Sequence, residues 1–95
     1  MIVTMKFDYY GDEAGLKAWD EAYKKACEET DGIKFKGRYS SHQARYHWAY
    51  IFVADSYDKL MDSWSKITIV RDRKKMDHAV IELFQGPFRG DSMNE

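Results

Sequence analysis

The sequence predicts a single α+β domain whose strands and helices follow one another in the order β-α-β-β-α-β. Three observations support this prediction: an alternating apolar pattern opens the chain, two amphipathic helical patterns occur further along, and strand-like segments follow each of them. With 95 residues, 44% of them hydrophobic, the chain has material for one modest core. We therefore expect one domain over residues 1–87 and a frayed C-terminal tail over residues 88–95.

The first predicted strand spans residues 2–9, where two sets of side chains alternate along the chain: one is Val3, Met5, Phe7 and Tyr9, the other Ile2, Thr4, Lys6 and Asp8. We expect Val3, Met5 and Phe7 to face the helices. Gly11 ends this strand, and Asp12 is placed to cap the helix that follows. Helical spacing continues towards Gly32, which is placed to end the helix in a left-handed conformation. The apolar side chains that recur at helical steps are Leu16, Trp19, Tyr23 and Ala26.

Residues 33–41 and 46–54 form the predicted central hairpin. If residues 43–46 make its loop, His42 lies opposite His47. The same register pairs large with small side chains and tyrosine with tyrosine: Ser41 with Trp48, Tyr39 with Tyr50, Gly37 with Phe52 and Phe35 with Ala54. It turns these aromatic side chains towards the helices and places on the other face Lys34, Lys36, Arg38 and Ser40.

The second predicted helix begins at the capping residues Asp55 and Ser56. Its apolar stripe consists of Tyr57, Leu60, Met61, Trp64 and Ile67. A charged connection leads to a last strand over residues 78–85, which Gly86 and Pro87 end. With right-handed crossovers, this order of elements builds a ferredoxin-like fold. We expect a four-stranded antiparallel sheet in the order 4-1-3-2, with both helices on one face.

Two helices on one face leave the other face of the predicted sheet open. The predicted register places six apolar side chains there: Ile2, Ala49, Ile51, Val53, Val80 and Phe84. Charged side chains rim them, namely Lys6, Lys34, Lys36, Arg38 and Glu82. An apolar patch of this kind typically meets a partner, and two-fold dimers are the commonest assemblies. We therefore expect a homodimer that associates through this face.

Composition limits the compartment and the partners. The chain has 15 basic and 16 acidic residues, a net charge of −1, which gives no general attraction to nucleic acids or to anionic membranes. Cys27 is the single cysteine, so an intrachain disulfide is excluded and a reducing compartment is indicated. No apolar run reaches the ~18 residues of a membrane span. We expect a cytoplasmic protein without a signal peptide, and an inert Cys27 thiol.

Three stretches, GIKFKGRYSSH, YIFVAD and SYDKLMDSWSKI, carry a family resemblance. Their motifs are the Gly37-Arg38-Tyr39 strand, the strand end at Ala54-Asp55, and Trp64 near the end of the second helix. The chain resembles a small bacterial and archaeal family of unassigned activity within the dimeric α+β barrel superfamily. The resemblance covers roughly residues 1–85 and implies the ferredoxin-like fold and a dimer. The superfamily includes small monooxygenases, haem-degrading enzymes and stress-response barrels.

The many aromatic residues suit a pocket for a small planar molecule between the helices and the sheet. Its aromatic lining would be Tyr9, Trp19, Tyr39, Trp48, Tyr50, Tyr57 and Trp64. Candidate catalytic residues near its mouth are Arg38, His42, His47 and Asp8. If the protein is an enzyme, the resemblance points to a cofactor-free oxygenase. The alternative is that these aromatic side chains fill the core and that the protein is a non-catalytic dimerisation module.

Metal and haem sites find little support in the sequence. His42 and His47 could begin a metal site, but a third ligand does not stand nearby, and zinc sites use about three or four protein ligands. Trp64 and His78 are similar to residues of haem-degrading members of the superfamily. However, the first strand has no Asn, and His78 begins the last strand instead of lying on the second helix. We therefore expect no metal and no cofactor.

RNA binding is an alternative because the RNA-recognition motif shares the same order of elements. The stretch YHWAYIFV matches the middle of that motif's third-strand signature but lacks its basic residue, its Gly and its last aromatic residue. The predicted alternation turns Trp48 and Tyr50 towards the helices, whereas the motif stacks bases on the open face. Together with the net charge, this argues against nucleic acid as a partner.

Overall fold

The computed structural model describes residues 1–42, 46–67 and 76–85, and for residues 76–80 the backbone alone. Its elements are β1 (Ile2–Tyr9), α1 (Glu13–Glu28), β2 (Ile33–Ser40), β3 (Trp48–Ala54), α2 (Tyr57–Ser65) and β4 (Met76–Phe84). The predicted β-α-β-β-α-β order is confirmed. The predicted tail over residues 88–95, like the domain boundary at residue 87, lies outside the described residues.

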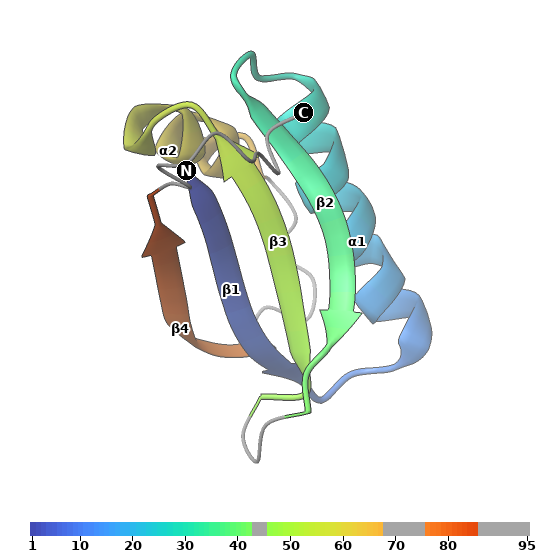
Figure 1. Ribbon diagram of the computed structural model, residues 1–95. Coiled ribbons are helices and arrows are strands. Elements are labelled where there is room, and N and C mark those ends of the chain that lie inside the picture. The colour runs from blue at the N-terminus through green and yellow to red at the C-terminus, as the bar shows by residue number, and fades with distance from the viewer. Residues whose placement is uncertain (43–45, 68–75, 86–95) are drawn as a thin grey trace.

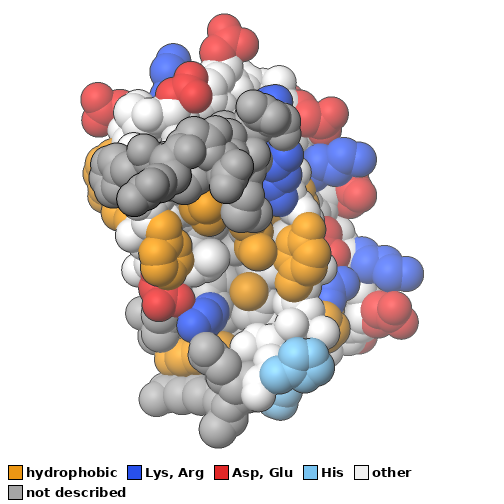
Figure 2. Space-filling model, viewed as in Figure 1, with side chains coloured by type: hydrophobic (Ala, Val, Ile, Leu, Met, Phe, Trp, Pro, Cys, Tyr) orange, Lys and Arg blue, Asp and Glu red, His pale blue; other side chains and the backbone are white. Residues whose placement is uncertain are grey.

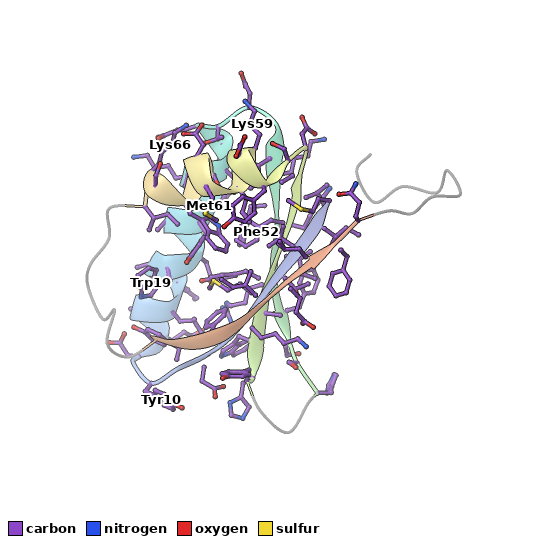
Figure 3. The ribbon with its side chains drawn as sticks, turned by 90° about the vertical axis from the view of Figure 1, so that its left-hand side faces the viewer. Tyr10, Trp19, Phe52, Lys59, Met61 and Lys66 are labelled. Atoms are coloured by element: carbon purple, nitrogen blue, oxygen red, sulfur yellow. The ribbon has the colours of Figure 1, made fainter. Side chains whose placement is uncertain are left out.

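The four strands form one antiparallel sheet in the order β2-β3-β1-β4 (Figure 1), which confirms the predicted order read from the other edge. Both helices lie on the same face of this sheet, as the view turned by 90° shows (Figure 3). Helix α1 packs along β2, and α2 contacts β2 and β3. The chain therefore has a ferredoxin-like α+β fold with one covered and one open sheet face.

Short-range hydrogen bonds set where the helices begin and end. The Asp12 side chain accepts a hydrogen bond of 2.7 Å from the backbone N–H of Gly15, and Ser56 caps α2 in the same way. Gly32 has a φ of +84°, so the left-handed conformation predicted for it is confirmed. Beyond α2, the Lys66 ammonium donates to the backbone oxygen of Glu29 and to Thr30, which ties the ends of the two helices together.

The core lies between the covered face of the sheet and the helices, and it is strongly aromatic. Tyr50 on β3 is fully buried, and its ring centroid lies 4.6 Å from that of Phe7 and 4.7 Å from that of Tyr23. The inward-facing residues of β1 predicted from the alternation are buried as expected. The other large side chains that are fully buried are Val3, Met5, Phe7, Phe52 and Leu60.

The predicted register of the hairpin is wrong. Instead of pairing with Tyr50, Tyr39 pairs with Ala49, and Arg38 pairs with Tyr50. Two one-residue shifts produce the difference: Ser41 instead of His42 lies opposite His47 at the loop end, and an irregularity between Phe35 and Arg38, where Gly37 adopts a φ of +104°, adds the second. An extra residue in one strand reverses the faces that follow it. Arg38 therefore turns towards the helices and Tyr39 turns to the open face, opposite to the prediction for both.

The end of the hairpin also departs from the prediction. The backbone N–H of Ser41 donates a hydrogen bond of 2.7 Å to the carbonyl oxygen of His47, so Ser41 lies opposite His47 and His42 does not. Tyr46 is buried and has a φ of +64°, an uncommon conformation for a residue other than glycine. Of the predicted loop over residues 43–46, only Tyr46 lies within the described part of the chain.

The conformation of Gly37 gives a prediction about stability. We expect Gly37→Ala to lower the free energy of unfolding by about 1–3 kcal/mol, because L residues are strained at its positive φ. A Cβ atom there would come no closer than 3.8 Å to its nearest neighbour, in the Tyr39 ring, so the loss reflects backbone strain and not a collision. Urea denaturation measures it, with Ser40→Ala on the same strand as control. An unchanged midpoint for Gly37→Ala would contradict this account of the register.

Candidate functional site

The open face of the sheet carries a continuous set of apolar side chains. Ile2 on β1 pairs with Val53 on β3 and with Phe84 on β4, so these three share one face. Ala49 and Ile51 continue the row along β3, and Figure 2 shows hydrophobic side chains gathered across this face. The backbone of Val80 pairs with Lys6, while its side chain lies outside the described residues. We call the described set the open-face patch: Ile2, Ala49, Ile51, Val53 and Phe84, of which Val53 is itself buried, at 6% exposed.

Two charged residues on the open face, Lys6 and Glu82, are paired with each other, while Lys34 at its β2 side is exposed. The Lys6 ammonium lies 2.9 Å from Glu82 Oε1, and the Thr4 hydroxyl donates to the same oxygen at 3.3 Å. Hydrogen bonding to Lys6 lowers the pKa of Glu82, so this carboxylate stays ionised and paired. At the β2 side of this face, Tyr39 is 50% exposed and donates from its hydroxyl to the carbonyl oxygen of Lys36.

Arg38 belongs to a polar network on the helix side of the sheet. Its Nε lies 2.9 and 3.0 Å from the two carboxylate oxygens of Asp20 on α1. The Tyr50 hydroxyl donates to the same carboxylate at 2.8 Å. The guanidinium also lies over the Trp48 ring, 4.2 Å from its centroid, which is a cation–π contact. The prediction that Arg38 rims the open face is therefore wrong, because the bulge at Gly37 turns it beneath α1.

The Arg38 network is suited to holding α1 in place and unsuited to proton transfer. Burial, followed by the hydrogen bond to Asp20, raises the pKa of Tyr50 far above its ordinary value. The phenol therefore remains protonated and acts as a hydrogen-bond donor. Asp20 was not among the residues that we singled out from the sequence. A residue on an amphipathic helix gives no signal for this role until the strand that it faces is known.

Two of the four candidate catalytic residues come together at the hairpin end. Asp8 Oδ1 accepts a hydrogen bond of 2.7 Å from the backbone N–H of His47 and lies 3.0 Å from His47 Nδ1. The Asp8 side chain is only 13% exposed, whereas that of His47 is 82% exposed. His42 is exposed and does not lie opposite His47 in the hairpin. Arg38 lies on the helix side of the sheet, against Asp20. The four candidates thus do not form one site.

No group of three or more His, Cys, Asp or Glu side chains is arranged to hold a metal within the described ranges. Likewise, no helix among the described residues is long and apolar enough to cross a membrane.

The aromatic residues predicted to line a pocket lie in different environments. Trp19 and Tyr50 are buried, while Tyr57 is 54% exposed on α2. The side chains that pack against the core from its periphery include Tyr9, Trp48 and Trp64. Tyr39 stands apart on the open face. Because the Tyr50 ring is surrounded by Phe7, Tyr23 and Phe35, these side chains pack against one another in the interior.

A groove lies at the outer edge of the sheet, between α1 and β2, and our sequence analysis did not identify it. Its volume is about 500 Å³, and it is lined by Lys24, Cys27, Glu28, Thr30, Asp31, Gly32, Ile33, Lys34, Phe35 and Lys36. A smaller hollow of about 240 Å³ shares Gly32, Ile33 and Lys34 with it and reaches Val53 and Asp55. The lining of the larger groove comes from α1, from β2 and from the turn that joins them.

Cys27 on the floor of this groove is not an activated nucleophile. It is 4% exposed, and burial raises the pKa of its thiol to about 11, although a hydrogen bond with Ser63 acts in the opposite direction. The neutral thiol dominates at physiological pH and is a poor nucleophile.

Comparisons of the chain with protein-family models, with curated proteins and with solved structures each found no match. What the chain does has to be argued from its fold and from the surfaces described above.

The network around Asp20 gives a second prediction about stability. We expect Asp20→Ala to lower the free energy of unfolding by about 2–3 kcal/mol, because it leaves the buried Tyr50 hydroxyl and the Arg38 guanidinium without their acceptor. Urea denaturation provides the measurement. Glu21→Ala, at the neighbouring exposed position of α1, is the matched control and is expected to change stability by less than about 0.5 kcal/mol. Equal stabilities of the two variants would show that the network does not support the fold.

Titration of Cys27 gives a prediction about pH. The folded state raises the thiol pKa from 9.0 to about 11, so the unfolded chain loses this proton first as pH rises. The contribution of the neutral Cys27 thiol to the free energy of unfolding is therefore complete below pH 9 and declines above it. Between pH 8 and pH 10 we expect it to fall by about 1 kcal/mol. Urea denaturation of the wild type and of Cys27→Ala at both pH values isolates this contribution, because tyrosine ionisation is common to both proteins. A stability difference between them that is independent of pH would refute the assignment.

Proposed function

We propose that the protein is a dimerisation module of the dimeric α+β barrel type, in which two copies associate through their open-face patches. The observation that supports this proposal is the one-sided arrangement of the fold, with both helices on one face and an apolar row on the other. Phe84 is 50% exposed, and Ile51 at the centre of the patch is half-buried. Burying apolar surface of this kind contributes about 25 cal/mol per Å².

The charges on the open face are compatible with such an association. An unpaired charge would make burial costly, but Lys6 and Glu82 already neutralise each other across β1 and β4. A two-fold axis would bring the same patch of a second copy against this one, so that each apolar row meets another apolar row. The patch therefore favours a second copy over a strongly charged partner.

The interior favours a module over an enzyme that works within a single copy. The aromatic side chains that would line a pocket between sheet and helices largely pack against one another, as the packing of Tyr50 against Phe7 and Tyr23 illustrates.

Trp48 pairs with Phe7 and lies on the covered face, which counts against base stacking on the open face and hence against RNA binding. A cytoplasmic location remains a prediction from the single cysteine.

The dimer proposal is tested by placing a charge in the patch. We expect the wild type to have twice the 11.2 kDa chain mass in light scattering at micromolar concentration. Ile51→Glu buries one uncompensated carboxylate per copy and should weaken association by at least about 100-fold, giving the monomer mass. Circular dichroism verifies that the variant remains folded.

The matched control is Tyr57→Glu, which introduces the same charge at an exposed aromatic residue on α2, and it should leave the dimer intact. A monomeric wild type would rule out the proposal. If Ile51→Glu and wild type have the same dimer mass, another surface forms the interface.

A further inference from the structure

The groove between α1 and β2 has a strand edge on one side and a helix on the other. Within the described part of the chain, strand β2 is the outer strand of the sheet and pairs with β3 alone. Helix α1 runs beside it in the opposite direction, since its residue Asp20 meets Arg38 near the end of β2. That ion pair lies beyond one end of the groove, and the turn through Thr30 and Gly32 closes the other. An added strand could therefore lie along the free edge, flanked by α1.

The floor of the groove is apolar. Ile33 and Cys27 are 5% and 4% exposed, and Phe35 is half-buried beside them. The irregularity between Phe35 and Arg38 interrupts the regular edge, which limits regular pairing to the stretch from Ile33 to Phe35, directly before Lys36. An occupant would therefore be short, of about four residues, with one or two apolar side chains that reach the floor.

Charge varies along the groove. Because α1 and β2 run in opposite directions, Glu28 and Asp31 lie level with the start of β2, where the lining includes Ile33. Lys34 also lines the groove near the start of β2, so one cation there stands against two carboxylates, whereas Lys24 and Lys36 lie further along, towards the Arg38 end. A ligand that carries a negative charge at one end only would place that end between Lys24 and Lys36, away from the two carboxylates.

We propose that this groove binds the C-terminal end of a short extended peptide, which adds to β2 as a parallel strand. The peptide backbone pairs with the free edge of β2 over Ile33–Phe35, and its terminal carboxylate lies beyond this stretch, near Lys24 and Lys36. An apolar side chain contacts the floor formed by Cys27, Ile33 and Phe35. The groove lies on the helix side of the edge, so this proposal does not depend on dimerisation through the open face.

The probe is the peptide acetyl-Ser-Val-Thr-Leu with a free carboxylate, titrated into ¹⁵N-labelled full-length protein and followed by amide chemical shifts. We expect shifts at residues 33–36 and at Lys24 and Glu28. The same peptide with a C-terminal amide should bind about tenfold more weakly, because it lacks the charge that the lysines recognise. A peptide methylated on alternate backbone nitrogens should bind at least about tenfold more weakly, because it cannot pair with a strand edge.

Lysine variants test the charge contribution. The double variant Lys24→Gln and Lys36→Gln should lose the preference for the free carboxylate, whereas Lys17→Gln, on α1 outside the groove lining, should retain it. A nitroxide at the peptide N-terminus should broaden the amide signals of Glu28 and Asp31 more than that of Lys36.

Several outcomes would overturn the proposal. They are equal affinity for the carboxylate and amide peptides, equal affinity for the methylated peptide, the opposite pattern of broadening, or absence of shifts at millimolar peptide. Shifts confined to β4 would assign the binding to the opposite edge. If acetate alone gives the same shifts at the same concentration, the groove binds small anions and not a peptide strand.

Discussion

The backbone conformation of Gly37 determines how the outer part of this fold is assembled. Its φ of +104° allows an irregularity in β2 between Phe35 and Arg38, so both of these residues point towards the helices. Without it, strict alternation would place Arg38 on the open face, and the Asp20 carboxylate would lose its ion-pair partner. The same irregularity moves Tyr39 to the open face. One residue in an unusual conformation thus sets the composition of both faces at this edge of the sheet.

The covered face shows how a small aromatic core accommodates polar tips. Tyr50 is fully buried, yet its hydroxyl reaches the Asp20 carboxylate, which Arg38 also binds. Trp48 covers the guanidinium from the sheet side. Arg38, Asp20 and Tyr50 come from three different elements, so their hydrogen bonds join β2, α1 and β3 by directional contacts as well as by apolar packing. The network of Arg38, Asp20 and Tyr50 therefore has a structural role, although it is rich in ionisable groups.

The two surfaces that remain available differ in the interactions that they offer. The open-face patch is apolar and lies beside the Lys6–Glu82 ion pair, which suits a second copy of the same chain. The groove beside β2 is narrow and carries separated charges together with unpaired strand edge, which suits an extended segment with a charged end. Lys34 lies at the boundary between them, since it pairs with Val53 and also lines the groove. The fold thus allows a second copy to bind the open face while a peptide binds along the β2 edge, because the two would contact different apolar residues.

The sequence by itself determined the order of the elements, the caps of both helices, the strand order of the sheet and the inward-facing residues of β1. These follow from hydrophobic periodicity and from capping residues, which act over a few positions along the chain. The register of the hairpin, the partnership of Asp20 with Arg38, the meeting of Asp8 with His47 and the groove beside α1 were decided only by the tertiary structure. Each depends on how far one strand is offset from its neighbour, and a single inserted residue with a positive φ changes that offset without altering the apolar pattern from which the strands are predicted.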